Sequence, residues 1–126
     1  MENRPKIMIV DDDPTNIEIV TEILEESYEI RPVYSGEEAL EEIYSFKPDI
    51  VLLDIMMPGI DGYEVCKIIR ADEQIKDITI LLVSAKAMAK EMKRGFEVGA
   101  DDYITKPIKR ETVFKMIEKW VFSKKM

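Results

Sequence analysis

The feature that most constrains the fold is a strict alternation of apolar segments with amphipathic segments along the chain. Five segments are predicted as strands, at residues 6–10, 29–34, 49–53, 79–83 and 102–105. The segments that follow them are predicted as helices, at residues 14–26, 36–45, 63–71, 86–98 and 110–122. Such alternation favours right-handed βαβ units on one parallel sheet, so we expect an α/β fold.

The composition of the predicted strands indicates their order in the sheet. The first, third and fourth are almost continuously apolar, which is typical of strands covered on both faces. The second contains Pro32, which cannot donate a ladder hydrogen bond, and the fifth is short and half polar, so both belong at edges. We therefore predict a doubly wound, five-stranded parallel sheet of order 2-1-3-4-5, a flavodoxin-like (βα)5 fold.

Length and composition indicate one globular domain over residues 1–126, with residues 1–5 and 123–126 as flexible ends. Apolar runs such as Ile80–Val83 are far too short to span a membrane, and the start of the chain has no secretory signal. The single cysteine, Cys66, cannot form an internal disulfide. We therefore expect a cytoplasmic protein.

The sequence contains no histidine, which excludes several kinds of chemistry. Ser-His-Asp and Cys-His catalysis, histidine metal sites and a histidine phosphocarrier role are all ruled out. The net charge of −8 argues against nonspecific binding of nucleic acid, which requires a clustered basic surface. Any reaction must therefore use carboxylates, hydroxyls or lysine.

Reactive polar residues follow four of the five predicted strands. Asp11 and Asp12 follow the first strand, Asp54 the third, Ser84 the fourth and Lys106 the fifth. Ligands of open parallel sheets bind beyond the carboxyl ends of the strands, where the strand order reverses. We therefore expect these side chains to converge on one site.

A cluster of carboxylates either raises the pKa of one of them or recruits a cation. Oxygen ligands without sulfur or imidazole suit Mg²⁺, with Mn²⁺ as an alternative. Such an ion attracts phosphate, whose remaining oxygens Lys106 and Ser84 can hold. The chain has no glycine-rich nucleotide loop, so we expect a small or protein-borne phosphoryl donor.

Four stretches of the sequence carry a resemblance to a known family. They are VDDDPTN at 10–16, LDIMMPGIDG at 53–62, VSA at 83–85 and GADDYITKP at 99–107. In this order and spacing the chain resembles the receiver domain of two-component response regulators. The resemblance implies that Asp54 is the phosphoacceptor for a sensor histidine kinase or a histidine phosphotransfer protein.

The resemblance also implies roles for the neighbouring residues. Asp11, Asp12, Asp54 and the backbone carbonyl of Met56 would hold the metal, while Ser84 and Lys106 would bind phosphoryl oxygens. A cis Lys106–Pro107 peptide would aim the lysine inward. Tyr103 would turn inward when Ser84 is drawn toward the phosphoryl group.

Partners and output are implied in the same way. The surface formed by the fourth helix, fifth strand and fifth helix would signal to a downstream target or a fused effector domain, and could form a dimer through the two helices. We expect no direct contact with nucleic acid or membrane. The domain would catalyse only its own phosphotransfer and autodephosphorylation. Met56 and Lys86 position water poorly, which predicts slow autodephosphorylation.

Three alternatives use overlapping residues. Asp11-x-Asp13-x-Thr15 is similar to the nucleophile motif of haloacid-dehalogenase-type phosphatases, and Ser84 fits their second motif. A receiver-like interaction module that is never phosphorylated is the second. The third is a calcium-binding loop with Asp11, Asp13 and Glu22 at positions one, three and twelve, although Asn16 replaces the glycine required at position six.

Other polar and apolar residues are expected to have structural roles. Asp13 is predicted to cap the first helix, and Asp61 with Gly62 to form the turn into the third. Asp101 and Asp102 are expected to be solvated, and Cys66 to pack in the core. The stripe formed by Met88, Met92 and Phe96 is expected to face the core, and Trp120 to lie on the apolar face of the last helix.

Overall fold

The computed structural model describes residues 4–86 and 88–125. Its strands are β1 Lys6–Val10, β2 Glu29–Val33, β3 Ile50–Asp54, β4 Thr79–Ser84 and β5 Asp102–Thr105. Its helices are α1 Pro14–Leu24, α2 Gly36–Phe46, α3 Gly62–Ala71, α4 Ala89–Glu97 and α5 Arg110–Lys125. All strand pairs are parallel, and the order is β2-β1-β3-β4-β5. The predicted fold and strand order are confirmed.

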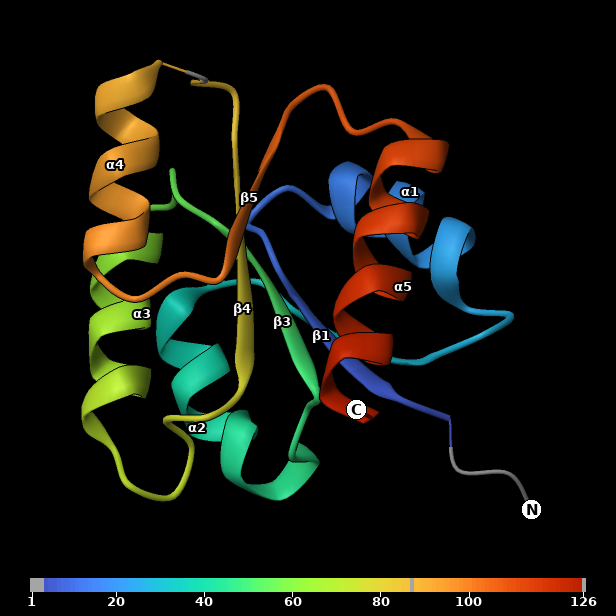
Figure 1. Ribbon diagram of the computed structural model, residues 1–126, viewed down its shortest axis with the longest axis horizontal. Helices are drawn as coiled ribbons and strands as arrows, with labels where there is room; N and C mark the ends of the chain where they lie inside the picture. The colour runs from blue at the N-terminus through green and yellow to red at the C-terminus, as the bar shows by residue number, and fades with distance from the viewer. Residues whose placement is uncertain (1–3, 87, 126) are drawn as a thin grey trace.

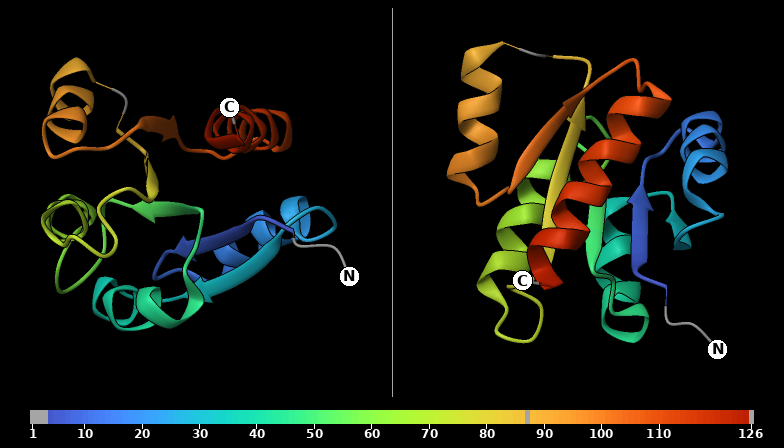
Figure 2. Two further views of the ribbon diagram at one scale, coloured as in Figure 1. Left: turned by 60° about the horizontal axis from the view of Figure 1, so that its bottom comes forward. Right: turned by 45° about the vertical axis from the view of Figure 1, so that its right-hand side comes forward.

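The sheet lies between two layers of helices. Figure 1 shows α2, α3 and α4 on one side of the strands and α1 and α5 on the other, and Figure 2 shows the same division from two further directions. A separate apolar cluster fills each interface between sheet and helices, so the central strands are buried on both faces. This double cover explains why the sequences of β1, β3 and β4 are almost continuously apolar.

Two strands continue one residue further than predicted, and both extra residues belong to the expected site. Asp54 is the last residue of β3 and pairs with Val83, while Ser84 ends β4 and pairs with Thr105. Backbone pairing therefore fixes the position of both residues at the carboxyl end of the sheet, which is uppermost in Figure 1.

Side-chain caps start the helices that follow β1 and β3. The carboxylate of Asp13 accepts a hydrogen bond from the Thr15 N–H, and that of Asp61 accepts one from the Glu64 N–H. Both predicted structural roles are thus confirmed. At Gly62 an added Cβ would lie 2.6 Å from the backbone oxygen of Asp54, so only glycine lets α3 begin this close to the end of β3.

The interpretation of the fourth helix was wrong in one respect. Among the described residues of α4 only Gly95 is buried; Phe96 is 46% exposed, and Met88, which precedes the helix as its N-cap, is 70% exposed. Met92 alone of the predicted stripe packs against the core. The helix begins at Ala89, not at Lys86, and rests on the sheet through its glycine, so most of the stripe points away from the core.

The ends of the chain are only partly described. Residues 1–3 and 126, which fall within the ends predicted to be flexible, lie outside the described residues, and α5 continues through Lys125. Across the described residues, no helix is both long and apolar enough to cross a membrane.

Candidate phosphoryl-transfer site

The predicted site residues from β1, β3 and β5 meet at one end of the sheet. Carboxylate oxygens of Asp11, Asp12 and Asp54 all lie within 4.8 Å of one another. Asp11 and Asp54 are buried, whereas Asp12 is exposed. The ammonium of Lys106 lies 3.5 Å from Oδ2 of Asp11 and 3.4 Å from Oδ1 of Asp54. Lys106 therefore pairs with the two buried members of the acidic cluster.

The backbone around Asp11 orients its carboxylate. Oδ1 of Asp11 accepts a hydrogen bond from the Asp13 N–H at 2.9 Å, which leaves Oδ2 directed toward Lys106. Asp13 uses its own carboxylate to cap α1, where it accepts from the Thr15 N–H. The third aspartate of the DDD sequence is therefore a helix cap, and the first two belong to the acidic cluster.

Asp54 is the most perturbed carboxylate of the cluster. Its pKa is raised from 3.8 to about 6, mainly by burial and then by the negative charge of Asp11, while Lys106 acts in the opposite direction. Within the described part of the chain, Oδ1 of Asp54 has no hydrogen-bond partner. It makes an ion pair with the Lys106 ammonium. A buried carboxylate oxygen without a hydrogen bond, beside two further carboxylates, fits a hard divalent cation.

Ser84, Lys86 and Tyr103 form a connected group next to the carboxylates. Oγ of Ser84 is buried and accepts a hydrogen bond from the Lys86 N–H at 3.1 Å. The buried Tyr103 hydroxyl donates to the Lys86 carbonyl at 2.7 Å. The N–H and the carbonyl of Lys86 are thus both bonded to side chains and not to helix backbone, which explains why α4 begins only at Ala89.

The remaining predicted residues lie around the same site. The Lys106–Pro107 peptide is cis, as expected, and the Lys106 N–H donates to the Ser84 carbonyl at 2.8 Å. The Met56 N–H donates to the Asp54 carboxylate, while the Met56 side chain is 61% exposed.

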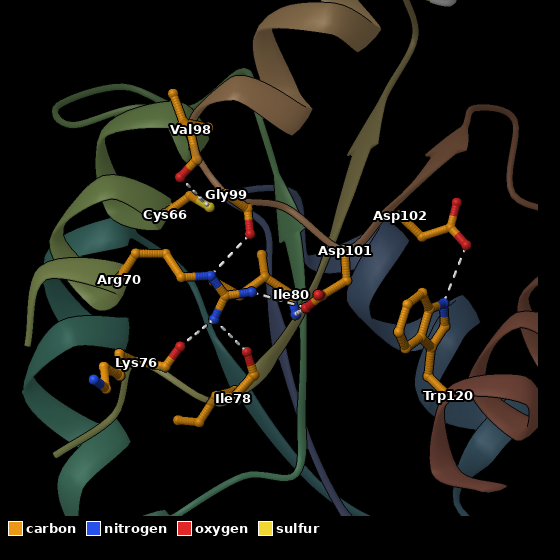
Figure 3. Close-up of polar contacts among 10 residues, drawn as sticks. All are labelled: Cys66, Arg70, Lys76, Ile78, Ile80, Val98, Gly99, Asp101, Asp102 and Trp120. Atoms are coloured by element: carbon orange, nitrogen blue, oxygen red, sulfur yellow. Dashed lines mark hydrogen bonds and ion pairs between the residues drawn. The ribbon is translucent and has the colours of Figure 1, made fainter. Parts of the chain in front are cut away.

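The expectation that Asp101 and Asp102 are merely solvated was wrong. Oδ2 of Asp101 accepts hydrogen bonds from the Ile80 N–H and from the Arg70 guanidinium, each at 2.8 Å (Figure 3). Oδ2 of Asp102 accepts one from the Trp120 indole N–H at 3.1 Å. Their partners come from other strands and helices, so local sequence contains no signal for these contacts.

Cys66 and Trp120 pack as predicted. The Cys66 thiol is buried, and burial raises its pKa to about 11, so it stays protonated and unreactive. Trp120 lies against the apolar cluster beneath α1 and α5 while its indole nitrogen reaches Asp102. The indole contact with Asp102 was not predicted.

Comparison with known proteins defines the class to which this fold and site belong. The family model described as "Response regulator receiver domain" matches residues 7–118. The chain belongs to this family and is a receiver domain of two-component response regulators. It is 39% identical over 107 residues to the DNA-binding response regulator MtrA of Mycolicibacterium smegmatis, a match that covers 84% of this chain and 46% of the relative.

A second relative is likewise matched over about half of its own length. The DNA-binding dual master transcriptional regulator RpaA of Synechocystis is 35% identical over 114 residues, which is 90% of this chain and 47% of that protein. The chain thus spans about half the length of the curated relatives it matches.

Solved structures agree with the sequence matches. A response regulator of Chloroflexus aurantiacus has a TM-score of 0.89 and 37% identity, with 94% of this chain and 98% of that chain covered. The receiver domain of DrrB activated by BeF3 has a TM-score of 0.85 and 30% identity, with 94% and 98% covered.

Two alternatives lose their support. The phosphatase reading is not favoured, because the family match covers most of the chain and Asp13 caps α1. The calcium-loop reading requires an open loop up to Glu22, yet residues from Pro14 onward form α1.

Proposed function

We propose that Asp54 of this receiver domain accepts a phosphoryl group from the phosphohistidine of a sensor kinase or a histidine phosphotransfer protein. The observation that carries the proposal is the Asp54 carboxylate itself. It is buried, has no hydrogen bond at Oδ1 from any described residue, and lies in a cluster with Asp11 and Asp12 beside Lys106. A purely structural aspartate in this position would be expected to have its oxygens satisfied.

Asp11, Asp12 and Asp54, with the Met56 carbonyl, would hold Mg²⁺ or, alternatively, Mn²⁺. Receiver domains generally use Mg²⁺, and the acidic cluster supplies the oxygen ligands that this ion prefers. When bound, the ion supplies positive charge for the phosphoryl oxygens. Asp11 and Asp12 hold their carboxylates at the rim, and Lys106 supplies a second, permanent positive charge.

The transfer forms one bond and breaks one. A carboxylate oxygen of Asp54 attacks the phosphorus atom, and the bond between phosphorus and the histidine nitrogen breaks, with its electron pair left on the imidazole. Lys106 and the Ser84 hydroxyl donate hydrogen bonds to phosphoryl oxygens. Hydrolysis by water restores the carboxylate; this autodephosphorylation is slow because Met56 and Lys86 flank the site and neither holds a water well.

The output is proposed to pass through Ser84 and Tyr103 to the surface of α4, β5 and α5. That surface would contact a downstream target, a fused effector domain or a second copy of this chain. The matched relatives are named as DNA-binding, yet we propose that this domain, over residues 1–126, does not contact nucleic acid directly, since its net charge is −8. A cytoplasmic location accords with this role.

Incubation with acetyl phosphate or phosphoramidate tests the proposal. We expect the intact mass to increase by one phosphoryl group when Mg²⁺ is present and not when it is chelated. Asp54→Asn should abolish the increase, and Asp101→Asn, a matched change at an aspartate bonded to Arg70 and to the Ile80 N–H, should retain it. No mass increase for the unmodified chain with Mg²⁺ would favour the interaction module that is never phosphorylated.

A further inference from the structure

Helix α4 is held by fewer apolar contacts than its neighbours. Only Gly95 is buried among its described residues, whereas α3 buries five residues, from Gly62 to Ile69. An added Cβ at Gly95 would lie 2.9 Å from the Leu82 side chain, so α4 touches the sheet at close range over a small area. Polar contacts must therefore contribute much of what fixes this helix.

Three of these polar contacts come from one stripe of α3. The Tyr63 hydroxyl donates to the Glu91 carbonyl at 3.2 Å, and the Cys66 thiol to the Val98 carbonyl at 3.4 Å. Nε of Arg70 donates to the Gly99 carbonyl at 2.8 Å. Residues 63, 66 and 70 lie on one face of a helix, so α3 binds the backbone of α4 near both of its ends.

The C-terminal end of α4 is firmly held. Arg70 donates to four acceptors, which are the carbonyls of Lys76, Ile78 and Gly99 and the carboxylate of Asp101 (Figure 3). Gly99 ends the helix with a φ of +105°, and the Gly99 and Ala100 N–H groups donate back to the carbonyls of Phe96 and Gly95. Arg70 is thus a fixed point for this end of the helix.

The N-terminal end is held more weakly. Met88 precedes the helix and makes no capping hydrogen bond with its side chain. Among the described contacts, the hydrogen bond that α3 makes near this end is the 3.2 Å bond from the Tyr63 hydroxyl to the Glu91 carbonyl. The Tyr63 ring also lies 4.1 Å from the guanidinium of Arg94, which belongs to the last turn of α4, and Tyr63→Phe keeps that ring contact. This end also adjoins Lys86, whose backbone groups are bonded to Ser84 and Tyr103.

From this asymmetry we infer that Tyr63 is a positioning residue for α4, and that the helix opens from its N-terminal end while Arg70 holds its C-terminal end. The Tyr63 hydroxyl then determines how readily the first turns of α4 detach from α3. The consequence for signalling rests on the proposed function, since it assumes that Ser84 responds to a phosphoryl group. The opening of α4 itself does not depend on phosphorylation.

Hydrogen exchange of the metal-free protein, followed by mass spectrometry, tests the inference. Tyr63→Phe keeps the ring and removes the hydroxyl, and we expect amides of residues 89–94 to exchange about fivefold faster, with residues 98–101 changed less than about twofold. Tyr44→Phe is the matched control, because the Tyr44 hydroxyl bonds Asp72, the C-cap of α3, and its loss should leave α4 unchanged.

Two results would overturn the inference. One is unchanged exchange in residues 89–94 of Tyr63→Phe; the other is an equal increase in residues 89–94 and in residues 98–101, which would indicate general destabilisation. Because the ratio between these two groups of amides decides, a variant of lower overall stability still gives an answer. Failure of Asp54 phosphorylation would leave this experiment unaffected, so the two proposals can fail separately.

Discussion

The two ends of the parallel sheet use the same kinds of charged residue in opposite ways. At the carboxyl end, Asp54 is buried next to Asp11, and its Oδ1 has no hydrogen-bond partner among the described residues although the Lys106 ammonium lies 3.4 Å away. At the amino end of β4, Asp101 accepts hydrogen bonds from Ile80 and Arg70, and all of the Arg70 bonds go to oxygen atoms of this one region. Figure 3 shows that second arrangement.

The difference lies in how completely each carboxylate is bonded. A carboxylate that accepts from a guanidinium and a backbone N–H is strongly stabilised and has little left to offer a ligand. One that is buried with an unsatisfied oxygen is costly to keep and ready to bind a cation or react. The end at which Asp101 bonds Arg70 and the Ile80 N–H therefore serves stability, and the end at which Asp54 lies is the one at which we place the chemistry.

The largest expected effect on stability is at Arg70. Arg70→Met should lower the free energy of unfolding by about 2–4 kcal/mol, because it removes the Arg70 donor from three carbonyls and the charged partner from Asp101. Urea unfolding followed by far-UV circular dichroism measures this change. An effect below about 0.5 kcal/mol, the size typical of surface substitutions, would contradict the structural role assigned to Arg70.

In the metal-free protein, Asp54→Asn should instead raise the free energy of unfolding. The folded-state pKa of about 6 lies above the ordinary 3.8, so the ionised carboxylate costs stability above pH 6 and the cost disappears as the pH falls to about 4. At pH 7.5 the variant should be more stable than the unmodified chain by up to about 3 kcal/mol, and the two should converge near pH 4.

Urea unfolding of both proteins at pH 7.5 and pH 4 measures this convergence. A difference between the two proteins that is the same at both pH values would show that ionisation of Asp54 is not its cause. Asp101→Asn is the control at the other end of the sheet, and it should lower stability because Arg70 loses its charged partner.

The smallest effect is expected at Trp120. Trp120→Phe removes the indole N–H that bonds Asp102, and Lys119 remains 3.5 Å from the same carboxylate oxygen. We expect a loss of about 1 kcal/mol in the free energy of unfolding, from the hydrogen bond and part of the ring area. Urea denaturation followed by circular dichroism, which does not need the tryptophan, measures it, and a loss as large as that of Arg70→Met would contradict this ranking.

The order of the strands and the place of the site could be predicted because both depend on patterns along the chain. Continuous apolar runs mark the covered strands. Asp11 and Lys106 directly follow a strand, and Asp54 and Ser84 are the last residues of theirs. The roles of Asp101 and Asp102 could not be predicted, because their partners Arg70 and Trp120 come from distant elements.

The fourth helix shows a second limit of sequence patterns. A stripe of apolar residues at helical spacing indicates a buried face only where the helix covers the sheet broadly. Here the contact with the sheet is made through Gly95, which carries no apolar signal, and the stripe residue Phe96 stays exposed. The polar contacts from Tyr63 and Arg70 that hold α4 are likewise invisible in periodicity.

The central claim is that the incompletely bonded carboxylate of Asp54 is the one that becomes phosphorylated. After incubation with acetyl phosphate and Mg²⁺, borohydride reduction converts a phosphorylated aspartate to homoserine, which peptide mass spectrometry locates. We predict homoserine at residue 54 alone. Homoserine at residue 11 with Asp54 unmodified would contradict the account and revive the phosphatase-type nucleophile.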